Sequence, residues 1–331
     1  MSTNPDMGLI YFPSIQPELK HYIIHGPTMG TRYSASFYAP SSIDLAKLHR
    51  YLQRAVDTVD DQMSPWKKHS DLVRFNADPI EKWIDIPLEM AVVVHEALHI
   101  SNLSNGAFNI GVGDLVNMWG FGPNEQLNED QASNTLIVSP AHDVFELDME
   151  RFQLKRNAAV ALDLCGIAKG FGVDELARVL IDFDINDFFV SIDGEIKASG
   201  SKPGDIPWSV GIENPDPLMR NADIGLEIED IAIATSGDYR HFKNTGDHQV
   251  SHTMNAERGL PVINKTTSVT IAAKNCISAD AWATALMVMD RKDAITLADQ
   301  IGIDAYICER SDQGVNSFGA GAFSALSDEL N

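Results

Sequence analysis

Runs of short strand patterns constrain the fold of this chain more than any other feature of its sequence. Apolar and polar residues alternate at 188–192, 195–199, 208–213, 224–229, 231–235, 249–254 and 267–273, mostly with hairpin-like spacing. Parallel neighbours need a long crossover, usually a helix, whereas antiparallel neighbours need only a turn. The sequence therefore predicts an α+β fold with a largely antiparallel sheet packed with helices.

Helical periodicity is confined to a few segments between these groups of strands. Apolar residues recur at helical spacing over 42–61, with Ser41 or Ser42 as N-cap, and again over 87–103, 167–182, 279–289 and 291–301. Further strands are expected within 21–38, where residues 26–31 separate two of them, and at 144–148, 152–155, 158–162 and 304–308. No repeat or linker divides the chain. We therefore expect a single domain over residues 1–331, with the polar stretch 123–143 as its candidate boundary.

Composition argues against several classes of partner. The formal net charge of −22 disfavours nucleic acid and anionic membrane surfaces, because both would repel such a protein. No apolar run approaches the roughly 20 residues of a transmembrane helix, and the first residues lack the regions of a secretion signal. We expect a cytoplasmic protein, or a periplasmic one if a leader has been removed. Three widely spaced cysteines predict neither a disulfide framework nor a zinc site.

Two distant segments suggest a site for a metal and a pyrophosphate. Asp280 and Thr284 are four residues apart near the start of a predicted helix, so their oxygens share one helical face. Mg²⁺ prefers such oxygens and often keeps water and substrate phosphates as further ligands. The turn at 163–170 carries Lys169 and could supply a backbone carbonyl and a cation for a phosphate. The alternative reading of Asp280 is a helix cap, which is the commoner role of an aspartate near a helix start.

Other polar residues stand at strand ends and in one loop. Predicted strands lead into 235–240, which includes Ser236, and into 251–255, which includes His252. Histidine ordinarily titrates near neutral pH, as a general base requires, although a structural histidine is the commoner case. Trp66 follows a proline in a polar loop, where it could stack on a flat ring while Ser64 and Ser70 anchor the loop. The common glycine-rich phosphate motifs are absent, so a nucleotide would bind by other means.

Taken jointly and in order, these segments resemble the ApbE family of FAD:protein FMN transferases from about residue 25 to residue 290. The segments that carry the resemblance are 28–31, 63–66 with Ser70 and Asn76, 106–109, 119–122, 163–170, 194–195, 208–213, 234–239, 251–252, 268–270 and 279–284.

The resemblance implies a T-fold-like architecture that binds FAD and Mg²⁺. By this resemblance Asp280, Thr284 and the carbonyl of Gly166 would hold the metal. His252 would lie at the reacting phosphate as the proton acceptor, with Asp280 as a second candidate for that role. The flavin nucleotide would be lined by Met29, Trp66, Ala107, Phe108, Asn109, Asp163, Lys169 and Met254, and we add Ser236 as a binding residue from its strand-end position.

Members of this family move FMN from FAD to a threonine or serine hydroxyl of a partner flavoprotein and release AMP. The acceptor residue must enter an open cleft, so we expect the partner to present it on a loop. Some members instead hydrolyse FAD to FMN and AMP, which is the first alternative. The second is a non-catalytic protein that holds FAD for a redox partner.

The chain departs from the family pattern at three places. Asn109-Ile110 replace the usual Asp-Pro, which removes one carboxylate from the expected pocket. Asn255-Ala-Glu-Arg-Gly259 replace Asp-Pro-Arg-Thr-Gly after the histidine, and Asp193-Gly194 replace a Gly-Gly pair. The first two changes favour the non-catalytic alternative, whereas the intact metal residues and histidine favour an enzyme.

Overall fold

A computed structural model describes residues 18–123, 136–215, 222–238, 242–245, 248–312 and 314–327. Its centre is an eight-stranded sheet in which hydrogen-bonded neighbours run antiparallel. In spatial order the strands are β1 (Leu19–Thr28), β2 (Thr31–Pro40), β6 (Phe188–Ile192), β7 (Glu195–Ser199), β10 (Ala232–Gly237), β15 (Thr266–Ala273), β16 (Asp304–Ser311) and β17 (Gly314–Ala320). The predicted α+β class with a largely antiparallel sheet is confirmed.

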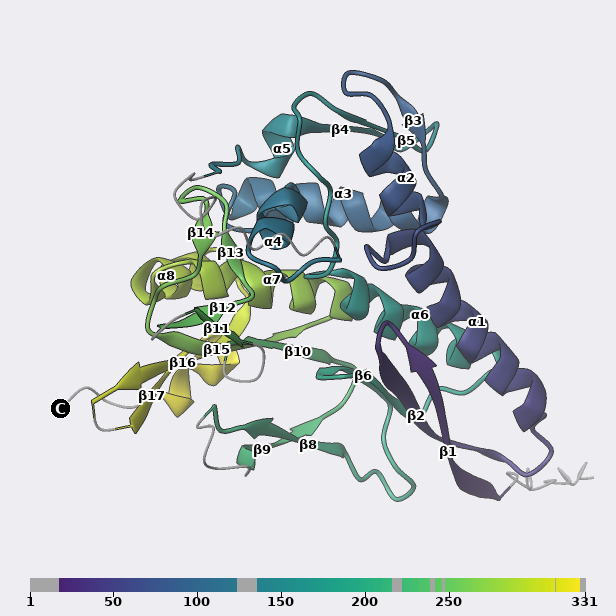
Figure 1. Cartoon of the computed structure of the whole chain (residues 1–331). Coiled ribbons are helices and arrows are strands. Elements are labelled where there is room, and N and C mark those ends of the chain that lie inside the picture. The colour runs from purple at the N-terminus through teal and green to yellow at the C-terminus, as the bar shows by residue number, and fades with distance from the viewer. Residues whose placement is uncertain are drawn as a thin grey trace, which may run out of the picture.

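A row of helices covers one face of this sheet (Figure 1). The row consists of α1 (Leu45–Met63), α6 (Ala168–Asp182), α7 (Cys276–Val288) and α8 (Arg291–Ile301). Alternation along β2 and β6 turns Ala35, Phe37, Phe188 and Val190 toward α1 and α6, where they form one buried cluster. The opposite face of the sheet is covered by the hairpin of β8 (Trp208–Glu213) and β9 (Ala222–Ile228), together with the 3₁₀ helix Gly321–Leu326.

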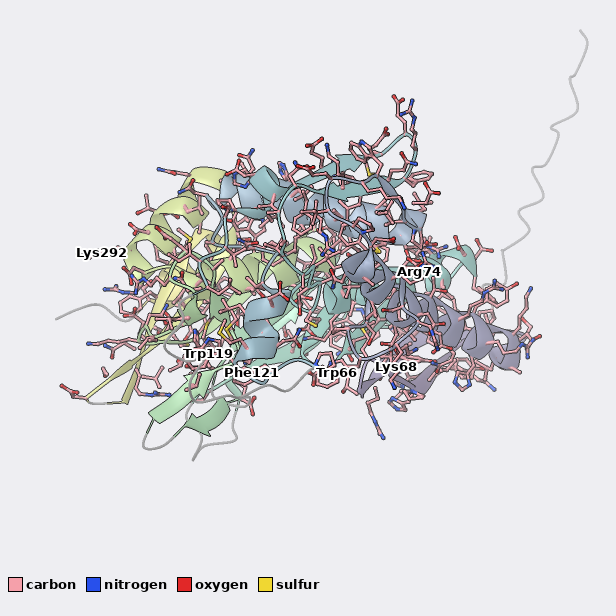
Figure 2. All side chains as sticks on the ribbon, turned by 45° about the horizontal axis from the view of Figure 1, so that its top comes forward. Trp66, Lys68, Arg74, Trp119, Phe121 and Lys292 are labelled. Carbon is pink, nitrogen blue, oxygen red and sulfur yellow. The ribbon has the colours of Figure 1, made fainter. Side chains whose placement is uncertain are left out.

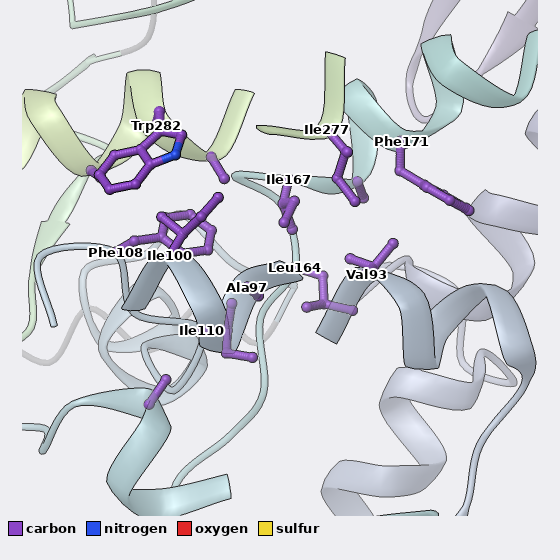
Figure 3. Packing of buried hydrophobic residues seen from close by; sticks show 14 of the residues in the cluster. Val93, Ala97, Ile100, Phe108, Ile110, Leu164, Ile167, Phe171, Ile277 and Trp282 are labelled. Atoms are coloured by element: carbon purple, nitrogen blue, oxygen red, sulfur yellow. The ribbon is translucent and has the colours of Figure 1, made fainter. Parts of the chain in front are cut away.

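A second layer lies beyond α7 and makes that helix almost wholly buried. Helix α3 (Leu88–Leu103) packs on it, and Figure 3 shows Ile100 of α3 and Phe108 below Trp282 of α7 in one buried cluster. Because α7 is enclosed by the sheet on one side and α3 on the other, its sequence is apolar all round rather than on one stripe. The few polar side chains on α7 are therefore exceptional.

Smaller elements complete the chain around these layers. They are α2 (Asp71–Ala77), α4 (Gly113–Met118), α5 (Ala141–Val144), the sheet of β3 (Ile84–Asp85), β5 (Gln153–Arg156) and β4 (Phe145–Asp148), and the hairpins β11 (Phe242–Thr245) with β12 (His248–Ser251) and β13 (Met254–Asn255) with β14 (Leu260–Pro261).

The predicted strand at 158–162 is wrong. Its backbone bonds mainly to side chains and also accepts from the Gly113 N–H at the start of α4, but it does not pair with a neighbouring strand. Asn76 donates to the Leu162 carbonyl at 2.9 Å and accepts from the Leu162 N–H at 2.7 Å, while the Arg156 guanidinium donates to the Val160 carbonyl at 2.8 Å. The first predicted N-cap is also wrong, because the Asp44 side chain, not Ser41 or Ser42, accepts from the Lys47 N–H at the start of α1.

Two expectations fall partly outside the described residues. Positions 124–135 of the candidate boundary and positions 1–17, which bear on a leader, are not among them. The single domain and the cytoplasmic location stay predictions. Within the described part of the chain, no helix is both long enough and apolar enough to cross a membrane.

Candidate functional site

A cavity of about 710 Å³ lies where the start of α6, the middle of α7 and the ends of β7 and β10 come together. This volume is within the usual range for small-molecule and cofactor sites. All but one of the predicted site residues line it, namely Trp66, Ala107, Phe108, Asn109, Asp163, Gly166, Lys169, Ser236, His252, Met254, Asp280 and Thr284. The fold thus brings together segments that are far apart in the sequence.

Met29 is the exception among the predicted residues. It lies in the turn between β1 and β2 with a φ of 45°, and its side chain packs against the apolar clusters of the helical layer. The Met29 methyl group lies beside Gly172 of α6, at 2.9 Å from where a Cβ of that glycine would stand. Met29 therefore packs against α6 and does not line the described cavity.

Asp280 is held as an inward-facing carboxylate on α7. It is only 4% exposed, and its Oδ2 accepts a hydrogen bond from the Gly170 N–H at 2.8 Å. The helix is capped instead by Asn275, whose side chain accepts from Ser278 N–H, so Asp280 is not a cap. One turn further along α7, the Thr284 hydroxyl lies 3.2 Å from the Ser236 hydroxyl at the end of β10.

The turn before α6 lies directly against these oxygens. A Cβ added at Gly166 would stand 3.1 Å from the Thr284 Oγ1, so a side chain at this position would crowd the Thr284 hydroxyl. Leu164 and Ile167 on either side of Gly166 are buried in the core (Figure 3), and this anchors the turn. Asp163 accepts from the Cys165 N–H at 2.8 Å, and burial raises the pKa of the Asp163 carboxyl.

Lys169 interacts with two carboxylates that line the cavity, through an ion pair with Glu195 and through the charge of Asp280. Its ammonium donates to Glu195, which is 2% exposed at the start of β7. Burial by itself would lower the pKa of Lys169, but the negative charges of Glu195 and Asp280 outweigh it and raise that pKa, so the ammonium stays charged. Burial and, secondly, the charge of Glu195 raise the pKa of Asp280 to about 7, although Lys169 partly offsets them.

Glu195 is a cavity residue that the sequence reasoning did not assign to the site. Strand alternation could have indicated that its side chain is buried beside α6. Glu195 and Lys197 share one face of β7, which turns them both toward α6. There they meet residues of opposite charge, since Lys197 pairs with Asp174 at 2.7 Å and Glu195 with Lys169.

Two aromatic side chains line the cavity, the exposed Trp66 and the partly buried Phe121. Trp66 is 61% exposed, and Figure 2 shows it on the same side of the molecule as Phe121. As predicted, Ser64 and Ser70 anchor the Trp66 loop: the Ser70 hydroxyl donates to the Ser64 carbonyl at 2.7 Å and accepts from the Val73 N–H. Phe121 meets the ring of His252 edge-on, with ring centroids 6.4 Å apart.

Asn109 forms two hydrogen bonds that connect separate segments of the cavity wall. Its amide nitrogen donates to the Ser139 carbonyl at 2.9 Å, and its amide oxygen accepts from the Gly111 N–H at 2.8 Å. An aspartate at this position could accept from Gly111 but could not donate to Ser139. The asparagine therefore ties the 106–111 turn to the segment that contains Ser139.

The donor set fits a hard divalent cation that shares its coordination with a substrate. Within the part of the chain that the structure describes, no group of three or more histidine, cysteine, aspartate or glutamate side chains could hold a metal. The cavity instead offers the Asp280 carboxylate, the Thr284 hydroxyl and the main chain at Gly166. All are oxygen ligands, which suits Mg²⁺ when substrate phosphates and water supply the rest.

Comparison with known proteins identifies a family and close structural neighbours. A model of the ApbE family matches residues 29–307. The chain is 34% identical over 307 residues to an FAD:protein FMN transferase of Vibrio cholerae, spanning 91% of each chain. It is 30% identical over 323 residues to one of Haemophilus influenzae, spanning 95% of this chain and 93% of the relative.

Two solved structures share the architecture. The flavin transferase ApbE from Vibrio cholerae superposes with a TM-score of 0.84 at 32% identity, covering 93% of this chain and 99% of that one. The apo form of the flavinyl transferase ApbE from Pseudomonas stutzeri gives 0.82 at 30% identity, with 93% and 97% covered.

Proposed function

This chain belongs to the ApbE family and is a transferase, and we propose that it moves FMN from FAD to a threonine or serine hydroxyl of a partner flavoprotein. AMP is released in this reaction. One observation carries the proposal. A buried carboxylate, two hydroxyls, a glycine turn and a lysine ammonium converge on one cavity beside an exposed tryptophan. Such a set suits a diphosphate joined to a flat ring.

Asp280, Thr284 and the main-chain carbonyl of Gly166 are the residues that would hold Mg²⁺. When bound, the ion would neutralise charge on the diphosphate and make its phosphorus easier to attack. Lys169 adds a fixed positive charge, because Glu195 and Asp280 raise its pKa and keep it protonated. The ammonium can therefore stabilise negative charge on the diphosphate and on the departing AMP.

The transfer step needs an activated hydroxyl. The acceptor oxygen forms a bond to the phosphorus of the FMN half, and the bond from that phosphorus to the bridging oxygen breaks. AMP leaves with the bridging oxygen, and the acceptor proton passes to His252, which lines the cavity. Trp66 would stack on the isoalloxazine ring and fix the direction of the phosphate chain.

Incubation with FAD, Mg²⁺ and a threonine-bearing acceptor protein tests this function. An FMN-sized mass increase on the acceptor, together with free AMP, is the expected result. Free FMN and AMP with an unlabelled acceptor would replace the proposal with FAD pyrophosphatase activity, and intact FAD with a carrier role. Asp280→Ala should abolish the Mg²⁺-dependent reaction, and undiminished turnover would remove Asp280 from the metal site.

A further inference from the structure

A second hollow of about 1210 Å³, which we call the side groove, adjoins the cavity described above, which we call the flavin cavity after its proposed ligand. Its walls come from residues 104–107, 137–140, 255–265 and 288–293. Ala107 and Val288 line both the side groove and the flavin cavity, so the two spaces adjoin at these residues. Figure 1 shows the elements that frame it, α5, α8 and the β13–β14 hairpin, grouped at one end of the molecule.

Helix α7 relates the side groove to the reacting centre. Asp280, Thr284 and Val288 follow at four-residue intervals and so share one face of the helix. Four residues of helix rise by about 6 Å. An extended chain advances about 3.3 Å per residue. A chain whose hydroxyl lies at Thr284 thus reaches Val288, where the side groove begins, within about two residues.

The side groove presents apolar side chains to solvent. Ile263 is 80% exposed and Ile137 is 67% exposed, the two highest values among the large hydrophobic residues that the structure describes. Two such side chains in one hollow beside a catalytic cavity indicate a surface that is covered in a complex.

The wall that carries Ile137 is firmly attached. The Val138 N–H donates to the Ala256 carbonyl at 2.9 Å, and the Ser139 carbonyl accepts from Asn109. Gly259 has a φ of 64°, and a Cβ there would stand 2.6 Å from the Leu136 carbonyl oxygen, so the two segments touch through their backbones. The side groove is therefore formed before any partner arrives, which lowers the entropic cost of docking.

The charge of the side groove differs from that of the whole chain. Its lining has equal numbers of basic residues (Arg258, Lys265, Arg291, Lys292) and acidic residues (Glu257, Asp290, Asp293, Glu309), whereas the chain has 25 basic and 47 acidic residues. A partner approaching elsewhere meets an excess of negative charge. At the side groove that excess is absent, so the lining favours a segment of little net charge with a large apolar side chain.

We propose that the side groove binds an extended, weakly charged segment of the acceptor protein, next to the residue that receives FMN, and holds a large apolar side chain of that segment against Ile263 and Ile137. This inference rests on the proposed transferase function. It assigns part of the acceptor specificity to residues 137–140 and 255–265, outside the flavin cavity.

A peptide-labelling experiment tests the proposal. The full chain is incubated with FAD, Mg²⁺ and a mixture of short synthetic peptides that carry a central threonine and random flanking residues. Labelled peptides are then sequenced by mass spectrometry. We expect enrichment of leucine, isoleucine, valine or phenylalanine at a fixed position two to four residues from the labelled threonine.

Ile263→Glu should replace this preference with lysine or arginine and lower labelling of the apolar peptides about tenfold, the effect of losing one buried isoleucine contact. Ile137→Glu should act in the same direction. The matched control is Ile23→Glu, because Ile23 is 54% exposed on the edge strand β1, away from the side groove. The control should keep the wild-type preference, and all three variants should keep the wild-type KM for FAD.

Each other outcome overturns the proposal in a recognisable way. If Ile263→Glu labels the same peptides as the wild type, the side groove is not the docking site, while the transferase function stands. If Ile263→Glu raises the KM for FAD, the side groove holds part of FAD instead of the acceptor. If the wild type cleaves FAD but labels no peptide, the proposed function fails and takes this inference with it.

Discussion

Changing Asp280 to asparagine should make the metal-free protein more stable at pH 8, although it removes a proposed metal ligand. The Asp280 carboxyl is buried and lies near Glu195, and both features raise its pKa to about 7. Asparagine keeps an oxygen that can accept from the Gly170 N–H but carries no charge. The variant therefore keeps the local hydrogen bond and loses the buried negative charge.

The direction of this stability change follows from comparing the pKa of Asp280 in the folded and unfolded states. The pKa rises from 3.8 in the unfolded chain to about 7 in the fold, so folding favours the protonated carboxyl. The stability that this group contributes is fully present below about pH 4 and is lost as the pH rises to about 7. A difference of roughly three pKa units corresponds to about 4 kcal/mol of unfolding free energy at most. Because Asp280 and Glu195 interact and titrate as a pair, we expect a stability gain of about 2 kcal/mol for the variant.

Urea unfolding in the presence of EDTA, from about pH 4 to about pH 8, measures this effect. The free energy of unfolding of Asp280→Asn should exceed that of the wild type by an amount that grows with pH and levels off above pH 7. Addition of Mg²⁺ should stabilise the wild type but not the variant, because only the wild type keeps the ligand. A difference that is constant with pH, or a wild type that is more stable at pH 8, would refute the reasoning.

Substitutions at three further positions address other parts of the cavity. His252→Ala should slow transfer at least a hundredfold while FAD remains bound, and a matching loss of FAD affinity would make His252 a binding residue instead. Trp66→Ala should weaken FAD binding about tenfold in a fluorescence titration and Trp66→Phe much less, whereas equal effects would argue against stacking. Asn109→Asp should lower the free energy of unfolding by about 1–3 kcal/mol, because it turns a donor to the Ser139 carbonyl into a repelling oxygen; unchanged stability would contradict this role.

Elements with long, regular patterns were predictable from the sequence. The helices at 87–103 and 291–301 and the strands at 188–192, 195–199 and 208–213 agree with the structure to within a residue. Each buries a regular set of apolar side chains, so its periodicity survives in the sequence. The short helices α2 and α4 and the last strand β17 were missed. Each of these helices is no more than two turns long, and too few residues repeat to reveal a buried face.

The strand predicted at 158–162 shows a different limit of sequence patterns. Its residues alternate well enough, yet its backbone bonds mainly to the side chains of Asn76, Asp114 and Arg156. Local periodicity indicates which residues are buried, but it does not indicate which groups form hydrogen bonds with the backbone. For the same reason the role of Glu195 was not predicted, because its buried carboxylate is stabilised by the ammonium of Lys169, which belongs to another element.

Two of the three departures from the family pattern, at Asn109 and at 255–259, meet at one place in the structure, and this place helps to decide between the transferase and the non-catalytic alternative. Asn109 bonds to Ser139, and Val138 beside it bonds to Ala256 in the altered 255–259 segment. Both changes therefore lie where the flavin cavity and the side groove adjoin, whereas Asp280, Thr284 and Gly166, the proposed metal ligands, match the pattern on which the resemblance rests. A chain that had lost catalysis would be free to change its metal ligands, whereas a chain adapted to its own acceptor would change the surface that the acceptor touches. The position of these two changes supports adaptation to a particular acceptor, and it therefore supports the proposed transferase function.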